Sequence, residues 1–243
     1  MPPIAHIVEP SLLYVTWQSP DESATDRLRR TIATVSGRGE STVFRYLKDS
    51  ADLPAAQAAG FQGFPAFSIS QVEHRVGVLE SLRRRLPPSK REDFNAYLAQ
   101  HHLPAPWIHS ELALLGYTGG SLPSDGFAFV PLFASGAVPC DYITEVAGLR
   151  HVFHGDTGAI RPGDAIELKT ECDNPIDRIA IGVLWRGHKL GYLNRALLVT
   201  ANRWLSEDCV SASVDRINGR PGRPLLHVRI EVREVPSATD GTA

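Results

Sequence analysis

The sequence predicts an α+β protein made of two domains, and two observations lead to this prediction. In residues 1–138, segments with helical apolar periodicity alternate with strand-like segments. In residues 139–236, short apolar runs are separated by glycine and proline turns, which is typical of a sandwich or a small barrel. A small-residue segment, SGAVPC, lies at the boundary, and 243 residues accommodate two domains of ordinary size.

Strands are predicted in the first domain where apolar and polar residues alternate or where a short apolar run occurs. They are residues 11–20, 41–50 and 127–133. Residues 21–37 leave two interpretations open. Asp21 is a suitable start for a capped helix, whereas residues 30–37 fit a strand equally well.

Helices are predicted in the first domain at residues 53–60, 72–86, 89–103 and 109–120. The second of these has the strongest signal, since its apolar residues recur at spacings of three and four: Val72, Val76, Leu79, Leu82 and Leu86. Ser89 is the candidate N-cap of the third helix, in which Phe94, Tyr97 and Leu98 form the apolar stripe. Ser110 and Glu111 are interpreted as the start of the fourth, which Gly116 or Gly119 ends.

The second domain is predicted to consist mainly of short strands: residues 143–153, 161–170, 179–187, 188–195, 210–219 and 225–235. One helix is predicted at residues 196–207. Residues 237–243 are expected to form a disordered tail, because they contain few groups worth burying.

Composition excludes several classes of protein. With 43% hydrophobic and 21% charged residues, the chain is neither disordered nor fibrous. The formal charge of −2 excludes a generally basic protein, so nucleic-acid binding requires a local patch. There is no apolar run of the length that spans a bilayer and no signal-peptide pattern, so we expect a soluble, cytoplasmic protein without membrane contact. The three cysteines lie far apart, without a C-x-x-C pair, and are interpreted as reduced thiols.

The spacing of the nucleophilic and titratable residues bears on catalysis and on metal binding. No Ser/His/Asp or Cys/His arrangement rises above chance, so no catalytic residue and no cofactor are predicted. His151 and His154 raise the question of zinc, but positions three apart on a strand face opposite sides and no recognised ligand spacing accompanies them. No metal site is therefore predicted, and an enzyme is the least favoured class of function.

Four motifs in the second domain occur in the order and at the spacing of one known family. They are AGLRH at residues 147–151, RPGDAIEL at 161–168, DNPIDRIAI at 173–181 and GYLNR at 191–195. On these motifs, residues of about 141 to 235 resemble a HIRAN domain. The resemblance implies an OB-like β-barrel that binds single-stranded DNA and recognises a free 3′ end.

The first domain looks like the N-terminal region that accompanies HIRAN domains in bacterial proteins. More distantly, it resembles the small N-terminal subdomain of HipA-type toxin kinases, through Trp17, Phe44, Tyr46, the Leu86-Pro87 stop and LALLGYTGG. The kinase core has no counterpart in the sequence, so phosphotransfer is not implied.

The HIRAN resemblance implies a set of nucleic-acid-binding residues: Arg150, His151, Asn174, Asp177, Tyr192 and Arg195. In the family, the first two positions lie at the DNA groove, the aspartate accepts a hydrogen bond from the 3′ hydroxyl, and the last two contact the DNA backbone. Simpler interpretations stay open: a surface arginine at Arg150, turn formation by Asn174 and Asp177, and a core position for Tyr192.

Two positions depart from the pattern of the members that bind DNA ends. Val152 and Ile176 stand where those members carry further aromatic residues, and aliphatic side chains cannot stack on a base as a ring does. Phe153 follows Val152 and is expected to point to the opposite face of the predicted strand.

The sequence therefore predicts two alternative functions. The first is a non-enzymatic nucleic-acid-binding protein whose barrel binds single-stranded DNA or a DNA 3′ end, in DNA repair or phage defence, with a protein partner for the first domain. The second is a protein-interaction module of a toxin–antitoxin or defence system that does not bind DNA.

Overall fold

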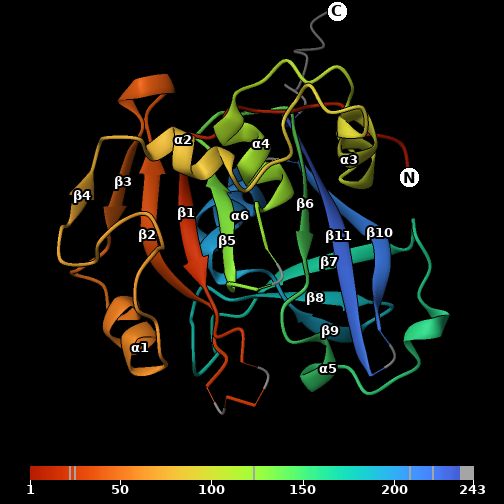
Figure 1. Ribbon diagram of the computed structural model, residues 1–243. Coiled ribbons are helices and arrows are strands. Elements are labelled where there is room, and N and C mark those ends of the chain that lie inside the picture. Colours follow the sequence, from red (N-terminus) through yellow and green to blue (C-terminus); the bar gives the residue numbers. More distant parts are fainter. Residues whose placement is uncertain (22, 25, 123, 208, 221, 236–243) are drawn as a thin grey trace, which may run out of the picture. The chain divides into compact units, whose positions relative to one another are not determined.

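The computed structural model describes residues 1–235 except 22, 25, 123, 208 and 221, so the predicted tail at residues 237–243 lies outside the described residues. The chain divides into two compact units (Figure 1). The first unit comprises residues 9–134 and Pro2, and the second comprises Met1, residues 3–8 and the chain from Ser135 onward.

The first unit contains a five-stranded antiparallel sheet with the strand order β4-β3-β2-β1-β5. Its strands are β1 (Leu12–Trp17), β2 (Arg30–Ser36), β3 (Val43–Tyr46), β4 (Glu73–His74) and β5 (Phe127–Leu132). The first and last of these pair across a long sequence separation, with Val15 opposite Phe129. The alternative that the sequence leaves open for residues 21–37 is resolved in favour of the strand, because β2 pairs with both β1 and β3.

Helices of the first unit are α1 (Asp52–Ala58), α2 (Val78–Arg83), α3 (Phe94–Gln100) and α4 (Glu111–Thr118), with a 3₁₀ turn at Gly39–Ser41. The predicted start and end of α4 are confirmed. The Ser110 hydroxyl accepts a hydrogen bond from the Ala113 N–H, and Gly119 follows the helix with a φ of 73°.

The prediction of one long helix at residues 72–86 is wrong. Glu73 and His74 form β4 and pair with β3. Gly77 then adopts a left-handed φ of 65°, and α2 begins only after it, so Val76 is 93% exposed. Pairing with β3 and packing of His74 against Phe44 override the helical periodicity, which is a local signal only. The third helix is likewise shorter than predicted and begins at Phe94, without a cap from Ser89.

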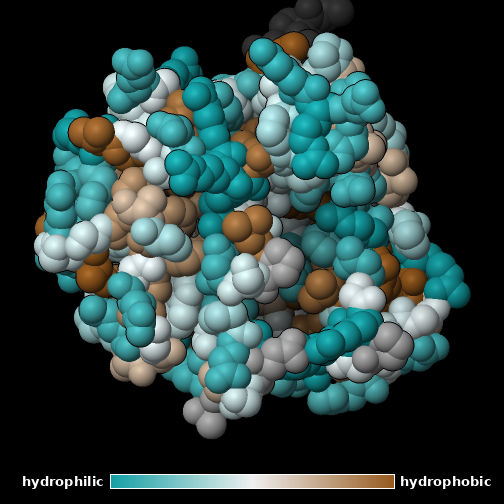
Figure 2. Space-filling view, viewed as in Figure 1, coloured by the Kyte–Doolittle hydropathy of each residue, from teal (hydrophilic) through white to brown (hydrophobic). Residues whose placement is uncertain are grey.

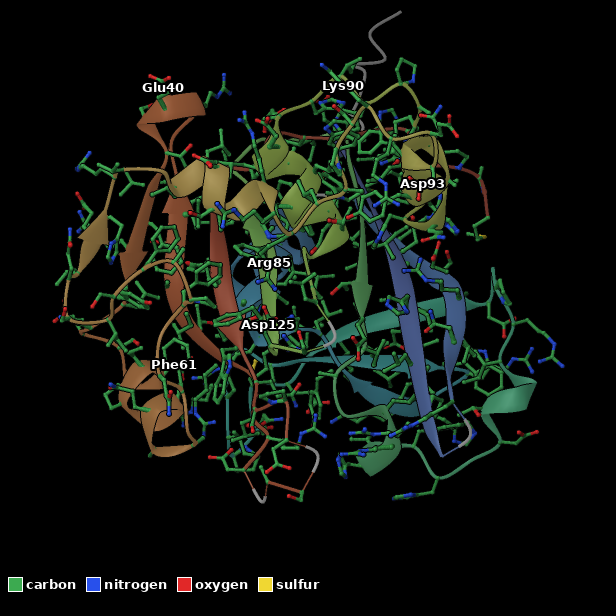
Figure 3. The ribbon with its side chains drawn as sticks, viewed as in Figure 1. Glu40, Phe61, Arg85, Lys90, Asp93 and Asp125 are labelled. Atoms are coloured by element: carbon green, nitrogen blue, oxygen red, sulfur yellow. The ribbon has the colours of Figure 1, made fainter. Side chains whose placement is uncertain are left out.

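A buried arginine lies against the aromatic core of the first unit. The guanidinium carbon of Arg85 is 5.5 to 5.6 Å from the ring centroids of Phe64, Phe127 and Phe129. Its two terminal nitrogens donate to the carboxylate of Asp125 at 2.7 and 3.0 Å, and its Nε donates to the Gly120 carbonyl. Figure 3 shows the Arg85 and Asp125 side chains beside each other. This pair satisfies a charge that would otherwise be buried alone.

The second unit is built on a six-stranded antiparallel sheet with the order β6-β11-β10-β7-β8-β9. Its strands are β6 (Cys140–Glu145), β7 (Ala165–Thr170), β8 (Ile181–Trp185), β9 (His188–Tyr192), β10 (Cys209–Arg220) and β11 (Arg223–Arg233). The sheet curls into a half-barrel, which confirms the predicted α+β class with an OB-like second part. The predicted helix at residues 196–207 is confirmed as a 3₁₀ turn at Arg195–Leu197 followed by α6 (Leu198–Glu207).

The prediction of a strand over residues 143–153 is wrong in its second half. β6 ends at Glu145, Gly148 has a left-handed φ of 78°, and Leu149–Val152 form the short helix α5. A left-handed residue favours glycine and turns the chain out of the strand direction. Residues of the AGLRH motif therefore lie on a helical turn, and a 3₁₀ turn follows at Thr157–Ala159.

Residues 3–8 are fixed to the second unit by one buried carboxylate, although the predicted boundary includes them in the first domain. Asp141 Oδ2 accepts hydrogen bonds from the backbone N–H groups of Ala5 and His6 at 2.9 and 3.0 Å. Asp141 Oδ1 also lies 2.7 Å from Arg233 Nη1. The N-terminal segment thus becomes part of the unit that contains the barrel strands.

Candidate nucleic-acid interface

The segment that follows the edge strand β6 lies beside the other edge strand, β9. Ala147 and Tyr192 exchange two backbone hydrogen bonds, at 2.8 and 2.9 Å, and so link the AGLRH segment after β6 to the GYLNR segment of β9. A Cβ atom at Gly191 would lie 2.3 Å from the Ala147 carbonyl oxygen. Glycine at this position therefore permits the close approach of the two backbones.

Residues 174–177 form a turn, which we name the NPID turn, and the side-chain amide of Asn174 stabilises it. Its Oδ1 accepts hydrogen bonds from the backbone N–H groups of Ile176 and Asp177 at 3.0 and 3.1 Å. Its Nδ2 donates to Glu171 Oε2 at 3.2 Å and to the Tyr192 hydroxyl at 3.4 Å. The predicted turn-forming role of Asn174 is thus present, and the same side chain ties the turn to β9.

Asp177 links the turn to the end of the GYLNR motif. Its Oδ1 accepts from the Ile179 N–H at 3.2 Å, and its Oδ2 lies 3.4 Å from Arg195 Nε. The Asp177 side chain is 23% exposed and that of Arg195 is 63% exposed. The guanidinium therefore faces solvent from beside a carboxylate.

Arg150 and His151 lie next to each other on α5, which packs against β9 (Figure 1). Both side chains are exposed, and Arg150 Nε donates to His151 Nε2 at 3.1 Å. The fold brings together four of the six residues that the resemblance implies, Asn174, Asp177, Tyr192 and Arg195, through the contacts above. Arg150 and His151 are joined to them through the Ala147 bridge.

An ion pair that the sequence does not single out lies under these residues. Lys189 Nζ is 2.5 Å from Glu171 Oε1 and donates to the Tyr192 hydroxyl at 2.7 Å. Partial burial by itself raises the pKa of Glu171, but hydrogen bonds from Lys189 and Asn174 outweigh it and lower that pKa. For Lys189, partial burial lowers the pKa, and the bonds to Glu171 and Tyr192 reverse this and raise it.

Glu171 has no signal in the sequence, since it belongs to none of the four motifs. Only the pairing of β7 with β8 and of β8 with β9 brings it to Lys189. Both partners of the pair carry charge at neutral pH, so it adds no net charge beneath the interface. The second half of the chain, from residue 141, contains 13 Lys and Arg against 14 Asp and Glu. Figure 2 shows hydrophilic residues over most of the visible face of the molecule, interrupted by separate apolar patches.

A pocket of about 460 Å³ opens beside α5, and we name it the α5 pocket. Its walls combine aromatic, imidazole and charged side chains: Val152, Phe153, His154, Gly155, Asp156, Ala159, Trp185, His188 and Lys189. The expectation that Phe153 points away from Val152 is wrong, because the segment is the end of a helix and both residues line the same pocket. The sequence does not single out Trp185 and His188, because they lie outside the four motifs.

A second, smaller pocket of about 350 Å³ lies at the NPID turn and is lined by residues that include Cys172, Asn174 and Ile176. Ile176 is 92% exposed at the tip of the turn. All three cysteines of the chain are free thiols. Within the described part of the chain, no three His, Cys, Asp or Glu side chains cluster as a metal site requires, and no helix is both long and apolar enough to cross a membrane.

Comparison with known proteins bears on the second unit. Residues 141–231 match the family model of the HIRAN domain. Two solved structures are similar. The HIRAN domain of human HLTF shares 21% identity over 38% of this chain and 74% of that chain, with a TM-score of 0.29. A protein from Lactobacillus plantarum shares 26% identity over 37% of this chain and 91% of that chain, with a TM-score of 0.26.

No curated protein matches the sequence. The family match confirms the resemblance of the second half, from its four motifs, to a HIRAN domain. It lies within the second unit, so the resemblance of the first unit to HipA-type N-terminal subdomains stays a prediction.

Proposed function

The chain contains a HIRAN domain at residues 141–231, and because such domains are generally nucleic-acid-binding modules, we propose that this one binds single-stranded DNA and prefers a free 3′ end. HIRAN domains are typically non-catalytic, and the protein acts in this proposal by binding alone. Its setting would be the repair of DNA or defence against phage in the cytoplasm, with the first unit recruiting a protein partner.

The observation that supports the proposal is the convergence of three motifs on β9: AGLRH and DNPIDRIAI both contact Tyr192, which belongs to GYLNR. The backbone bridge between Ala147 and Tyr192 carries α5, with Arg150 and His151, to the strand that ends at Arg195. An exposed guanidinium neutralises a phosphate, an imidazole ring stacks on a base, and an ionised carboxylate accepts a hydrogen bond from a hydroxyl. All three groups are present on adjoining elements.

Asp177 also explains how a 3′ hydroxyl would be distinguished from a 3′ phosphate. An ionised carboxylate accepts hydrogen bonds but repels a second anion. Since Arg195 already pairs with Asp177 at 3.4 Å, the two side chains would contact the terminal hydroxyl and the adjacent phosphate of one nucleotide.

The test is fluorescence anisotropy with a 5′-labelled oligothymidylate at low salt. We expect the wild-type chain to bind, and to bind an oligonucleotide with a 3′ phosphate more weakly. Arg150→Ala and Arg195→Ala should each weaken binding and lower the slope of log K against log salt by about one. Arg84→Ala is the matched control, because Arg84 is an arginine of the first unit with 80% of its side chain exposed. Absence of binding, or arginine variants that bind like the wild type, would refute the proposal.

One observation favours the alternative of a protein-interaction module. Ile176 is 92% exposed, and the exposed apolar residues Ile179 and Val199 lie on the same turn and on α6. Asn202 of α6 joins these segments, since its Nδ2 donates to the Ile179 carbonyl at 2.8 Å. Capture of partners from the native host with and without nuclease separates the two functions. Partners that persist after nuclease treatment and are lost with Ile176→Asp would favour the interaction module.

A further inference from the structure

We propose that the α5 pocket receives an unpaired nucleobase of the strand bound at the candidate interface. This inference rests on the proposed function and adds a base-stacking site that none of the four motifs contains. It also accounts for Val152 and Ile176, which offer no ring at the positions where stacking was expected. The pocket volume of about 460 Å³ lies within the range of small-molecule sites, roughly 300–1,000 Å³.

The indole ring of Trp185 lines the α5 pocket and is held by two contacts. Trp185 is only 7% exposed, and its Nε1 donates to Asp164 Oδ2 at 2.8 Å. The guanidinium of Arg186 lies 4.7 Å from the centroid of the indole ring. Since the indole is buried and a cation lies on its face, it forms a rigid wall of the pocket, and the more exposed rings of Phe153 and His188 are left to stack on a base.

Phe153 forms a second wall and is held in place by a glycine. A Cβ atom at Gly155 would lie 2.6 Å from Cζ of the Phe153 ring, so this ring packs directly over the glycine backbone. The Phe153 side chain is half-buried and lines the pocket. His154 and His188 are exposed and contribute imidazole rings at the pocket walls. Aromatic surfaces of this kind stack on any base, whatever its sequence.

The α5 pocket is continuous with the candidate interface through two shared elements. α5 carries Arg150 and His151 within the same turn as Val152, which lines the pocket. Lys189 also lines the pocket, while its ammonium group reaches the Tyr192 hydroxyl at 2.7 Å. A strand whose phosphate is bound at Arg150 therefore has a neighbouring base beside the pocket.

The polar groups of the pocket suit the edge of a base better than a phosphate. Lys189 is already paired with Glu171 at 2.5 Å, and the Asp156 carboxylate accepts a hydrogen bond from the Gly158 N–H at 2.7 Å. An anion here would meet a carboxylate and a neutralised lysine, whereas a base presents both donors and acceptors to the two imidazoles. The occupant is therefore a base and not the phosphate backbone.

The test uses the full chain, a 5′-labelled oligothymidylate and four oligonucleotides that each lack one base among the last four positions. Phe153→Ala and His188→Ala should each weaken binding of the intact oligonucleotide by about fivefold to 150-fold. One of the four abasic oligonucleotides should bind the wild-type chain with a similar loss. On that oligonucleotide Phe153→Ala should have no further effect, because the base that stacks on the ring is missing.

Two further variants guard against a loss of folding. Phe153→Tyr keeps the ring and should bind like the wild type. Gly155→Ala moves the Phe153 ring without removing it and should reproduce part of the loss, with an unchanged melting temperature. If the wild type binds and Phe153→Ala and His188→Ala bind equally well, only the pocket is refuted. If the wild type binds no oligonucleotide at low salt, the proposed function fails and the pocket fails with it.

Discussion

Asp177 and Arg195 belong to separate motifs of the second unit and form an ion pair, with Arg195 Nε 3.4 Å from Asp177 Oδ2. The arginine side chain remains 63% exposed, so it can contact a second anion without leaving the carboxylate. In the proposed function, the pair supplies a cation for a phosphate and an acceptor for a hydroxyl on adjacent segments of the barrel. The end preference of the proposed binding depends on this arrangement.

Asp177→Asn should separate affinity from end preference. The amide oxygen can still accept from the Ile179 N–H, now at 3.2 Å from Asp177 Oδ1, but the negative charge beside Arg195 is removed. We expect single-stranded DNA to bind a few-fold more tightly and the preference for a 3′ hydroxyl over a 3′ phosphate to fall towards one. Anisotropy titrations with both oligonucleotides measure this. Glu167→Gln is the charge-matched control on β7, and an equal gain with it would show an effect of net charge only.

Gly191→Ala should destabilise the second unit more than Gly187→Ala does. The added Cβ at Gly191 would lie 2.3 Å from the Ala147 carbonyl oxygen and 2.8 Å from a methyl group of Val146, so the backbone bridge must open. We expect a loss of about 3 kcal/mol. At Gly187 the φ is 78° and a Cβ meets nothing within 4 Å, so only the backbone strain of about 1 kcal/mol applies. Urea denaturation compares the two, and equal losses would contradict the role of the bridge.

Asn174→Asp should destabilise the NPID turn in a pH-dependent way. The substitution keeps the acceptor for two N–H groups but places a second carboxylate where Nδ2 now donates to Glu171 Oε2 at 3.2 Å. Repulsion raises the pKa of one of the two carboxyls in the folded state, so the cost is present at neutral pH and is relieved as the pH falls through that raised pKa.

Asn174→Ala provides the comparison, because it removes the hydrogen bonds without adding charge. It should cost about 1 kcal/mol at pH 7. Only the part that comes from the bond to Glu171, which helps to lower the pKa of that carboxyl, is lost as the pH falls. Denaturation curves at pH 7 and pH 4.5 distinguish the two variants. A cost of Asn174→Asp that does not change with pH would show that the carboxylates do not meet.

Lys189→Met should reveal the pH range in which the ion pair with Glu171 stabilises the fold. The lowered pKa of Glu171 makes its contribution present above the ordinary value of 4.5 and lost as the pH falls. The raised pKa of Lys189 makes its contribution present below the ordinary value of 10.5 and lost as the pH rises. Between these limits we expect a cost of about 0.5–1 kcal/mol.

The matching variants are Glu171→Gln and the double variant, which complete a double-mutant cycle. The coupling free energy should be present at pH 7 and decrease as the pH falls below 4.5 through the lowered pKa of Glu171. Coupling that does not decrease on acidification while the chain stays folded would mean that the contact does not depend on the ionised carboxylate.

Arg85→Met should destabilise the first unit strongly. The thioether can still pack among Phe64, Phe127 and Phe129, but Asp125 loses its buried partner. Breaking such a pair costs about 3–5 kcal/mol. Arg84→Met is the matched control, because the Arg84 side chain is 80% exposed and should change stability by less than about 0.5 kcal/mol. Urea denaturation measures both, and similar stabilities would contradict the importance of the buried charge.

The sequence predicts well those features that depend on neighbouring residues. Alternation and turn residues identify most barrel strands, and the Ser110 cap and Gly119 delimit α4. The predictions are wrong where pairing with a distant segment overrides the local pattern, as at residues 73–74, which join a sheet against their helical periodicity. A local cause explains the other error, because the left-handed Gly148 ends the predicted strand and α5 follows it.

In the candidate site, too, the sequence predicts the local features and not those that depend on distant segments. The six implied residues follow from the motifs, and the turn chemistry of Asn174 follows from the residues around Pro175. Glu171, Trp185 and His188 could not be found, because their roles arise only when β8 and β9 fold against β7 and α5. Phe153 was assigned to the wrong face because a strand alternates its side chains and the end of a helix does not.

By itself, the sequence determined the resemblance of its second half to a HIRAN domain, and residues 141–231 match the model of that family. It also indicated the turns and strand ends at which the motifs lie, because local hydrogen bonds and backbone preferences act between near neighbours. Only the tertiary structure decided that those motifs converge. That convergence depends on the close approach of Ala147 to Gly191 and Tyr192, and on side-chain bonds from Asn174 and Asp177 to β9 and its end. Contacts between residues far apart in the chain depend on sheet register and curl, which local patterns do not encode.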